Sequence, residues 1–134
     1  MCDVMKGIGG VGVDLCAISR MEPLLKDHRF LDRYFTPGEK AYIRQKGAAA
    51  APTMAGIFAA KEAALKAMGV GLALPMRSLE VTHTPAGAPV LTVHEPPFPC
   101  RFHLSISHEG DMAVAFVVMI PGEDRVLAEG EGST

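Results

Sequence analysis

Three charged side chains, Lys61, Glu62 and Lys66, interrupt an apolar stretch over 58–71. At about 100° per residue, the apolar residues share one face of a helix, and Glu62 and Lys66 lie one turn apart at its edge. Lys61 falls within the apolar face, where a cation needs an anionic partner or a route to water. An acid between two lysines indicates a functional site. The alternative is that Lys61 reaches to water and the other two form an exposed ion pair.

Asp14 is a second acid in an unusual setting. Apolar residues alternate along 10–16, which predicts a strand and places Asp14 on the same face as Gly12. Glycine at that position leaves room for a ligand or for another backbone. Aspartate is rare inside strands. Asp14 therefore belongs either to a site or to a solvated strand end before a helix capped by Ser19.

A third informative segment, 101–119, predicts a β-hairpin with its turn at 109–111. The second strand, 112–119, is almost entirely apolar, which predicts that it is buried on both faces. On the first strand Ser107 and His108 point to opposite faces, so they are poorly placed to act as nucleophile and base. His108 is either a packed or capping histidine or a ligand-binding side chain.

The order of elements predicts an α+β fold in which helices pack on an antiparallel sheet. We expect helices over 19–31, 37–47 and 53–68, and strands over 9–15, 78–84, 88–94, 101–107 and 112–119. The segment 48–51, which ends at Pro52, is expected to be a loop. The chain is expected to be one domain, 1–120, followed by a flexible C-terminal tail, 121–134.

Composition places broad limits on function. The 134 residues are 49% hydrophobic, which is enough for one domain with a real core. A formal net charge of -2 argues against general nucleic-acid binding. No apolar run approaches the roughly 18 residues of a membrane span, and the first ten residues lack the apolar stretch of a secretory signal. Three widely spaced cysteines favour a reduced, cytoplasmic setting.

These segments together resemble the holo-acyl-carrier-protein synthase family, the small phosphopantetheinyl transferases. The family's G-x-G-x-D-i-x-x-i-x-R pattern is matched at 10–20, its A-G-R-F-A-A-K-E-A-x-x-K-A-x-G-x-G helix at 55–71 and its S-i-S-H strand at 105–108. An F-T-x-x-E turn and a G-x-P hairpin are matched at 35–39 and 86–90. The resemblance spans 7–119 with all motifs in order, which makes it specific.

The resemblance implies the 4'-phosphopantetheinyl transferase fold, usually as a homotrimer with sites between subunits. The reaction it implies moves the phosphopantetheine arm of coenzyme A to a serine of an apo acyl carrier protein and releases adenosine 3',5'-bisphosphate, as in fatty acid biosynthesis. Such phosphoryl transfer depends mainly on positioning and charge stabilisation, with Mg2+ bridging phosphate oxygens.

The same resemblance assigns the catalytic group to Asp14, Glu62 and Lys66. Asp14 and Glu62 would hold Mg2+, which takes a few carboxylates and keeps waters and substrate oxygens as its other ligands. The general base stays open between a water held by the carboxylates and Glu62 itself.

The coenzyme A contacts implied by the resemblance come from two segments. Lys61 and Lys66 would face the pyrophosphate. His108 and the turn from Gly69 to Gly71 would lie along the nucleotide.

A basic segment follows the first predicted strand and includes Arg20, Lys26 and Arg29. Acyl carrier proteins are acidic, and the family presents this region to them, with the residue at Arg20 closest to the serine that is modified. Taken without the resemblance, the segment would be a solvated charged helix.

The chain departs from the family pattern at Ile57, where arginine is usual and would be expected near a phosphate of coenzyme A. This difference keeps a second hypothesis open, in which the chain is a non-catalytic module that binds a carrier protein or coenzyme A. Retention of Asp14, Glu62, Lys61 and Lys66 favours catalysis, because a binding module has no need of a metal between pyrophosphate oxygens.

Overall fold

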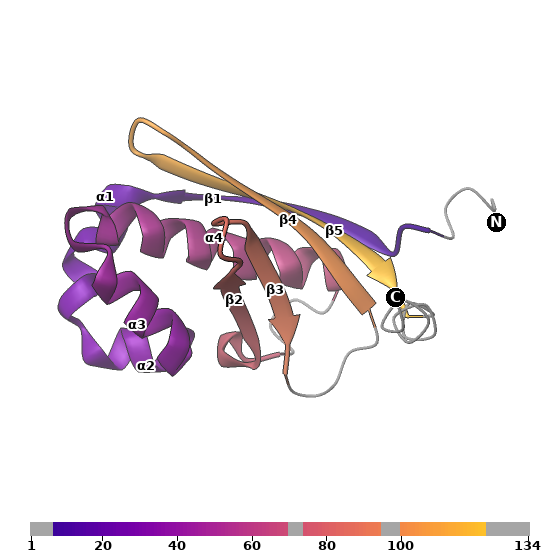
Figure 1. Cartoon of the computed structure of the whole chain (residues 1–134), viewed down its shortest axis with the longest axis horizontal. Coiled ribbons are helices and arrows are strands. Elements are labelled where there is room, and N and C mark those ends of the chain that lie inside the picture. The colour runs from indigo at the N-terminus through magenta and orange to yellow at the C-terminus, as the bar shows by residue number, and fades with distance from the viewer. Residues whose placement is uncertain (1–6, 70–73, 95–99, 123–134) are drawn as a thin grey trace.

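The computed structural model of the chain describes residues 7–69, 74–94 and 100–122, and Figure 1 shows its long strands lying across one long helix. The helices are α1 (Ile18–Met21), α2 (His28–Tyr34), α3 (Pro37–Gln45) and α4 (Ala50–Met68), with 3-10 helices η2 (Glu22–Lys26), η3 (Gly47–Ala49) and η5 (Met76–Ser78). The strands are β1 (Gly10–Ala17), β2 (Leu79–His83), β3 (Pro89–Val93), β4 (Cys100–Glu109) and β5 (Met112–Pro121). The predicted tail, 121–134, lies outside the described residues from position 123 onward.

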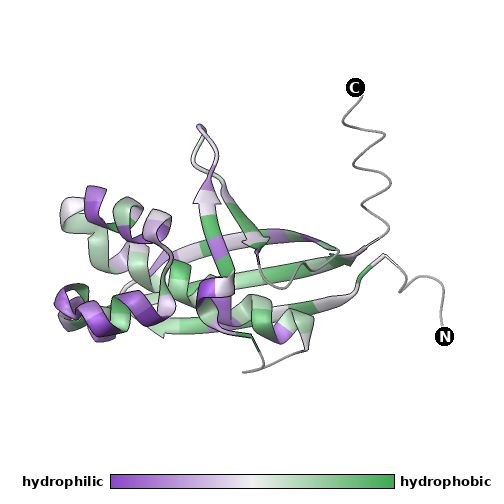
Figure 2. Ribbon diagram, turned by 90° about the horizontal axis from the view of Figure 1, so that it is seen from below, coloured by the Kyte–Doolittle hydropathy of each residue, from purple (hydrophilic) through white to green (hydrophobic). Residues whose placement is uncertain are grey.

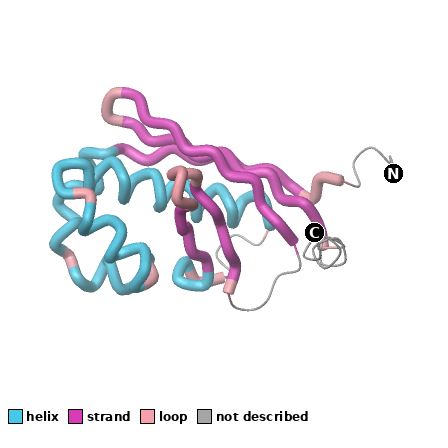
Figure 3. Tube along the Cα trace, in the orientation of Figure 1, coloured by secondary structure: helices cyan, strands magenta, loops and turns pink. Residues whose placement is uncertain are grey.

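The main sheet is antiparallel, with strand order β1-β5-β4, and β2 pairs with β3 in a separate hairpin. Figure 3 shows the helices on one side of the long strands, which confirms the predicted α+β arrangement. In Figure 2 hydrophilic residues gather on the helices at one end of the molecule, whereas hydrophobic residues follow the strands and α4. Although α4 is largely apolar, neither it nor any other helix in the described ranges has the length and hydrophobicity to cross a membrane.

Two glycines of β1 allow this strand to lie directly against α4. A Cβ atom at Gly12 would be 1.9 Å from the carbonyl oxygen of Ala63, and one at Gly10 would be 2.0 Å from that of Ala67. Any side chain at either position would therefore force strand and helix apart. The space beside Gly12 is filled by another backbone, which was one of the two expectations for this glycine.

The predicted helix over 19–31 is wrong, because α1, η2 and α2 replace it. Pro23 has no backbone N–H and lies in the first turn of the 3-10 helix η2. Asp27 then caps α2 by accepting a hydrogen bond from the backbone N–H of Phe30 at 3.1 Å. Ser19 does not cap α1 with its side chain. Its hydroxyl donates instead to Asp111, in the turn between β4 and β5.

The predicted loop over 48–51 is also wrong, because η3 and the first turn of α4 occupy it. Pro52 lies within that first turn. The first N–H groups of a helix have no acceptor in the helix itself, so proline removes no hydrogen bond there. The predicted helices over 37–47 and 53–68 end within two residues of α3 and α4, although α4 begins three residues earlier than predicted. Each strand begins and ends within two residues of its predicted bounds.

The outer face of β1 and β5, opposite α4, is apolar and exposed. Val11, Val13 and Leu15 on β1 are each more than half exposed, and Phe116 on β5 is 48% exposed. Only alternate residues of β5 face the core, so the prediction that this strand is buried on both faces is wrong for the single chain. A contiguous apolar surface of this kind is typical of a protein contact.

Candidate functional site

Asp14 and Lys66 contact each other at the sheet edge formed by β1. The close approach of Gly12 to α4 positions Asp14, two residues further along the same strand face, beside the last turns of the helix. Nζ of Lys66 lies 3.1 Å from Oδ1 of Asp14 and donates a hydrogen bond to the carbonyl oxygen of Val13 at 2.8 Å. The Lys66 side chain is 55% exposed. The pair is therefore accessible to a ligand.

Glu62 lies one helical turn before Lys66 and close enough to Asp14 for the two carboxylates to influence each other. Burial raises the pKa of Glu62, and the negative charge of Asp14 raises it further, while Lys66 and Arg20 act in the opposite direction. The structure thus brings Asp14, Glu62 and Lys66 together, although they come from segments about fifty residues apart.

The two carboxylates are suited to a hard divalent cation that shares its coordination with a substrate. Across the described residues, no group of three or more His, Cys, Asp or Glu side chains is arranged to hold a metal ion. Asp14 and Glu62 would therefore supply only part of a coordination shell. Mg2+ is commonly held by one or two carboxylates, with waters and phosphate oxygens as the other ligands. The donor set fits Mg2+ next to a phosphate.

The predicted carrier-protein contacts are exposed at the helical end of the molecule. Arg20 lies on α1, Lys26 on η2 and Arg29 on α2. The guanidinium of Arg20 lies 5.9 Å from the ring centre of Phe58, and its positive charge opposes the rise in the pKa of Glu62. Arg20 therefore lies between the carboxylates and this basic surface.

Lys61 does not lie in this site, so the prediction that it faces the pyrophosphate is wrong. Its side chain is fully buried on another face of α4. Nζ lies 2.6 Å from Oε1 of Glu39 and donates to the carbonyl oxygen of Tyr34 at 2.7 Å. The anionic partner that the apolar face requires is thus Glu39, which makes Lys61 part of the core.

Glu39 was not predicted to be the partner of Lys61. Its carboxylate accepts hydrogen bonds from the backbone N–H of Thr36 at 2.9 Å and of Val81 at 2.7 Å, in addition to the contact with Lys61. The hydroxyl of Thr36 accepts in turn from the N–H of Glu39, which completes a capping box at the start of α3. The F-T-x-x-E turn carried the signal, because its Thr and Glu have capping-box spacing.

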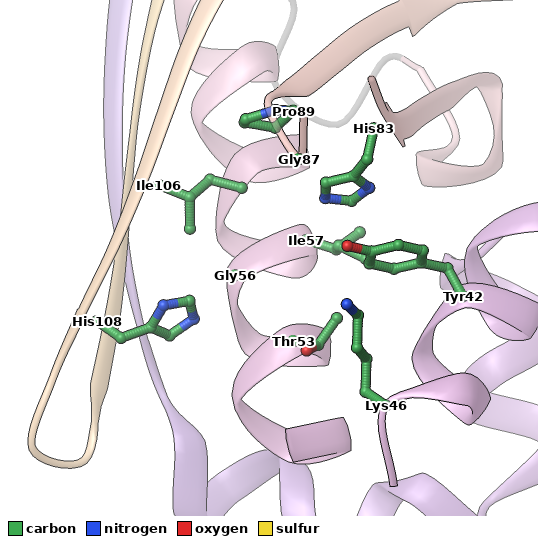
Figure 4. A pocket seen from close by; sticks show the side chains of 10 residues that line it. All are labelled: Tyr42, Lys46, Thr53, Gly56, Ile57, His83, Gly87, Pro89, Ile106 and His108. Atoms are coloured by element: carbon green, nitrogen blue, oxygen red, sulfur yellow. The ribbon is translucent and has the colours of Figure 1, made fainter. Parts of the chain in front are cut away.

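His108 lines a separate cavity of about 230 Å³ between α4, β4 and the β2–β3 hairpin (Figure 4). Its Nε2 lies 2.9 Å from the carbonyl oxygen of Pro52. Ile57 and Lys46 line the same cavity, so the position that departs from the family faces a lysine. The Lys46 Nζ lies 4.6 Å from the ring centre of Tyr42.

His83 also lines this cavity and was not predicted as a site residue. Its ring stacks on Tyr42 with the centroids 4.0 Å apart and the planes 8° from parallel. Burial lowers the pKa of His83, and the positive charge of Lys46 lowers it further. The Nδ1 atom of His83 is buried and has no hydrogen-bond partner among the described residues. The cavity thus combines aromatic surface with polar groups that could contact a ligand.

The carboxylate pair and the cavity do not meet within one chain. Asp14 is on β1 and His108 on β4, at opposite edges of the main sheet with β5 between them. On α4, Glu62 is rotated by roughly 140° from Ile57 about the helix axis. One chain therefore presents these two regions on different sides of α4.

Gly69 ends α4 in the left-handed conformation, with φ of +73°. Its N–H bonds to the carbonyl oxygens of Leu65 and Lys66. Gly71 lies outside the described residues. The contact of this turn with a nucleotide therefore stays a prediction.

Comparison with known proteins identifies the family of this chain. Residues 10–117 match the family model of the 4'-phosphopantetheinyl transferase superfamily. The holo-(acyl-carrier-protein) synthase of Methylobacterium sp. (strain 4-46) is 41% identical over 127 residues, which cover 84% of this chain and 93% of that protein. The enzyme of the same name from Halorhodospira halophila is 40% identical over 126 residues, with 86% and 99% covered.

Solved structures show the same relationship. The synthase of Bacillus anthracis in complex with CoA (3',5'-ADP) has a TM-score of 0.76 and 34% identity, and covers 87% of this chain and 99% of that one. The Helicobacter pylori synthase in complex with coenzyme A has a TM-score of 0.72 and 32% identity, with 81% and 98% covered. These matches confirm the predicted fold. The chain belongs to the holo-acyl-carrier-protein synthase family, the enzymes of the 4'-phosphopantetheinyl transferase superfamily that act on acyl carrier proteins.

Proposed function

We propose that this enzyme transfers the 4'-phosphopantetheine group of coenzyme A to a serine of apo acyl carrier protein in a Mg2+-dependent reaction that releases adenosine 3',5'-bisphosphate. The observation that carries the proposal is the meeting of Asp14, Glu62 and Lys66 at one edge of the sheet. Two relatives with the same fold are bound to coenzyme A or its nucleotide, which supports coenzyme A as the donor.

In the proposed mechanism, the seryl oxygen of the carrier attacks the phosphorus that bears pantetheine. A new P–O bond forms, and the bond to adenosine 3',5'-bisphosphate breaks with its electron pair on the leaving group. Asp14 and Glu62 would hold Mg2+, which when bound supplies charge neutralisation at the phosphate oxygens. Lys66 places a further positive charge beside the pyrophosphate. The seryl proton passes to a water held by the carboxylates or to Glu62 itself.

The nucleotide end of coenzyme A would occupy the cavity lined by His108. Lys46 gives this cavity a cation, in place of the arginine that the family usually has at Ile57. The neutral aromatic surface of Tyr42 and His83 is compatible with a base.

We further propose that the enzyme is a homotrimer in which each site forms between two subunits. The carboxylates and the cavity lie at opposite edges of the main sheet, and the apolar outer face of β1 and β5 is exposed in the single chain. Association through that face would bury Val11, Val13, Leu15 and Phe116. It would also allow the β1 edge of one subunit to approach the cavity of the next.

The partner in this proposal is an acidic acyl carrier protein of fatty acid biosynthesis in the cytoplasm. Arg20, Lys26 and Arg29 form an exposed basic surface that begins beside the carboxylates. Complementary charge at this surface would speed association and orient the carrier serine. Arg20→Glu should therefore raise the KM for the carrier and leave the KM for coenzyme A unchanged.

One experiment tests the chemistry. Apo acyl carrier protein, coenzyme A and Mg2+ are incubated with the enzyme, and the holo carrier and adenosine 3',5'-bisphosphate are quantified by chromatography. Equal amounts of both products, formed only when Mg2+ is present, would support the proposal. Binding of coenzyme A without either product would favour the non-catalytic binding module, for which Ile57 is the supporting observation.

A second experiment tests the shared site. Asp14→Asn impairs the β1 edge and His108→Ala impairs the cavity, so each variant should be poorly active alone. Unfolded and refolded together, they should form mixed trimers in which about a quarter of the interfaces combine two intact halves. Recovery of activity in the mixture would support the arrangement. Activity no higher than that of the separate variants would rule it out.

A further inference from the structure

Asp111 fastens the tip of the β4–β5 hairpin to the beginning of α1. It lies in the two-residue turn between Glu109 and Met112. Its backbone carbonyl accepts from the N–H of Ile18 at 2.7 Å. Its carboxylate accepts from the N–H of Ser19 at 2.9 Å through Oδ1, and from the hydroxyl of Ser19 at 2.7 Å through Oδ2. We call this set of three hydrogen bonds the Asp111 latch.

The latch supplies what the local sequence of α1 lacks. This helix is only four residues long, and its N-cap residue, Ala17, has no side chain able to accept a hydrogen bond. The first N–H groups of a helix need acceptors from outside it, and a helix this short is not stable alone. Asp111, 92 residues away from Ser19, provides those acceptors. The path of the chain from β1 into α1 is therefore set by the hairpin.

Arg20 follows Ser19 directly and depends on that path. Its guanidinium lies over the ring of Phe58 on α4 and close enough to Glu62 to affect its ionisation. If α1 lost the latch, Arg20 would lose its fixed position relative to the carboxylates. The side chains of Asp14 and Lys66 would be less affected, because the Gly12 contact and the Lys66 hydrogen bonds hold them.

From this geometry we infer that Asp111 is a positioning residue for carrier-protein recognition, and that it acts by holding α1 so that Arg20 faces the serine to be modified. This inference rests on the proposed function. It concerns how the enzyme selects its protein substrate rather than how it binds coenzyme A.

Charge alone predicts the opposite result, which makes the inference sharply testable. Removal of an exposed carboxylate near a surface that binds an acidic protein should strengthen binding, because one repulsion is lost. Glu109 lies on the same hairpin, is exposed, and is two residues from Asp111. Glu109→Ala is therefore the matched control, since it removes the same charge and leaves intact the two side-chain hydrogen bonds of the latch that Asp111→Ala removes.

The test measures the KM for apo acyl carrier protein and for coenzyme A separately, in the full-length enzyme. Asp111→Ala should raise the carrier KM by about tenfold and leave the coenzyme A KM unchanged. A factor of this size corresponds to the free energy that the loss of a helix cap costs. Glu109→Ala should leave the carrier KM unchanged or lower it. Asp111→Asn should have a carrier KM close to that of the wild type. Its amide oxygen can still accept from the Ser19 N–H, and its NH2 group can donate to the Ser19 hydroxyl.

A double-mutant cycle shows whether Asp111 acts through Arg20. In an Arg20→Ala background, Asp111→Ala should have little further effect on the carrier KM. A full tenfold effect in that background would overturn the inference, as would equal carrier KM values for Asp111→Ala and Glu109→Ala. Equal increases in both substrate KM values would also overturn it, because they would indicate general damage.

A further variant, Ser19→Ala, keeps the outcome decisive. If Asp111→Ala does not fold, Ser19→Ala removes only the hydroxyl bond and should still raise the carrier KM by about twofold to threefold. An unchanged carrier KM in Ser19→Ala, together with failed folding of Asp111→Ala, would assign the latch to stability alone. Absence of transfer by the wild-type enzyme would instead contradict the proposed function.

Discussion

Lys61 and Glu39 form an ion pair inside the core, with Nζ of the lysine 2.6 Å from Oε1 of the glutamate and both side chains fully buried. Burial lowers the pKa of Lys61 and raises that of Glu39, and the attraction between them opposes both effects. The pair joins α4 to the start of α3, and the Glu39 carboxylate also binds β2 through Val81. Lys61 and Lys66, both in the same helix motif, therefore have different roles.

Matched substitutions should separate these roles. Lys61→Met leaves Glu39 buried without its cation and should lower the free energy of unfolding by about 3–5 kcal/mol. The KM of the folded fraction for coenzyme A should not change. Lys66→Met should cost less than about 1 kcal/mol of stability, because the side chain is exposed, but should impair transfer. Urea unfolding and transfer kinetics measure both. Normal stability with a raised coenzyme A KM in Lys61→Met would contradict the assignment.

Gly12 is expected to tolerate no side chain. Gly12→Ala would place a methyl group against the Ala63 carbonyl and should destabilise the fold by about 1–3 kcal/mol, with loss of transfer because Asp14 moves away from Glu62. Gly7→Ala is the control. Nothing lies within 4 Å of a Cβ there, and the change should stay within about 0.5 kcal/mol. Thermal unfolding and transfer assays compare the two variants. Similar effects in both would refute the close-packing argument.

Periodicity predicted the sheet well, because alternate residues of each strand face α4 and the others face outward. It wrongly predicted one basic helix over 19–31, because the run of basic residues continues across two helix boundaries. Pro23 disfavours continuation of the preceding helix, and Asp27 is the N-cap at which α2 begins. The burial of β5 on one face only was not predictable from composition. An apolar strand has the same sequence whether a neighbouring layer belongs to its own chain or to another.

The sequence predicted those parts of the site whose positions follow from helix and strand geometry alone. Glu62 and Lys66 are one turn apart on any helix, and Gly12 signalled the close approach that places Asp14 beside them. The partner of Lys61 was not predictable, because tertiary packing selected Glu39, 22 residues away. The sequence did indicate that a lysine on an apolar face requires some anion.

Lys46 should carry the phosphate contact that Ile57 cannot make. Both residues line the cavity beside His108, whereas Arg44 and Arg77 line other cavities. Lys46→Ala should weaken coenzyme A binding by roughly tenfold, as expected for loss of a charge-assisted contact, and Arg77→Ala should not. Ile57→Arg should then add less than about tenfold. Calorimetric titration of coenzyme A tests all three. A large gain in Ile57→Arg with no loss in Lys46→Ala would show that the contact is simply absent.

As the pH is lowered, the rate of transfer should begin to fall at a higher pH than the ordinary pKa of a glutamate would predict. The pKa of Glu62 is raised by burial and by Asp14, so Glu62 takes up a proton at a higher pH than an exposed glutamate. A protonated carboxyl cannot hold Mg2+, so the rate should fall as the pH decreases through that raised pKa. Initial rates at limiting Mg2+ across acidic and neutral pH measure this limb. An acid limb at about 4.3, the ordinary glutamate pKa, would contradict it.

The most direct test of the catalytic site is the intact mass of apo acyl carrier protein after incubation with coenzyme A, Mg2+ and each of three enzymes. The wild type should add one phosphopantetheine group to each carrier molecule. Asp14→Asn and Glu62→Gln should add almost none while keeping the wild-type circular dichroism spectrum, because each removes a carboxylate from a partly solvated site. Full modification of the carrier by either variant would contradict the assignment of these two residues.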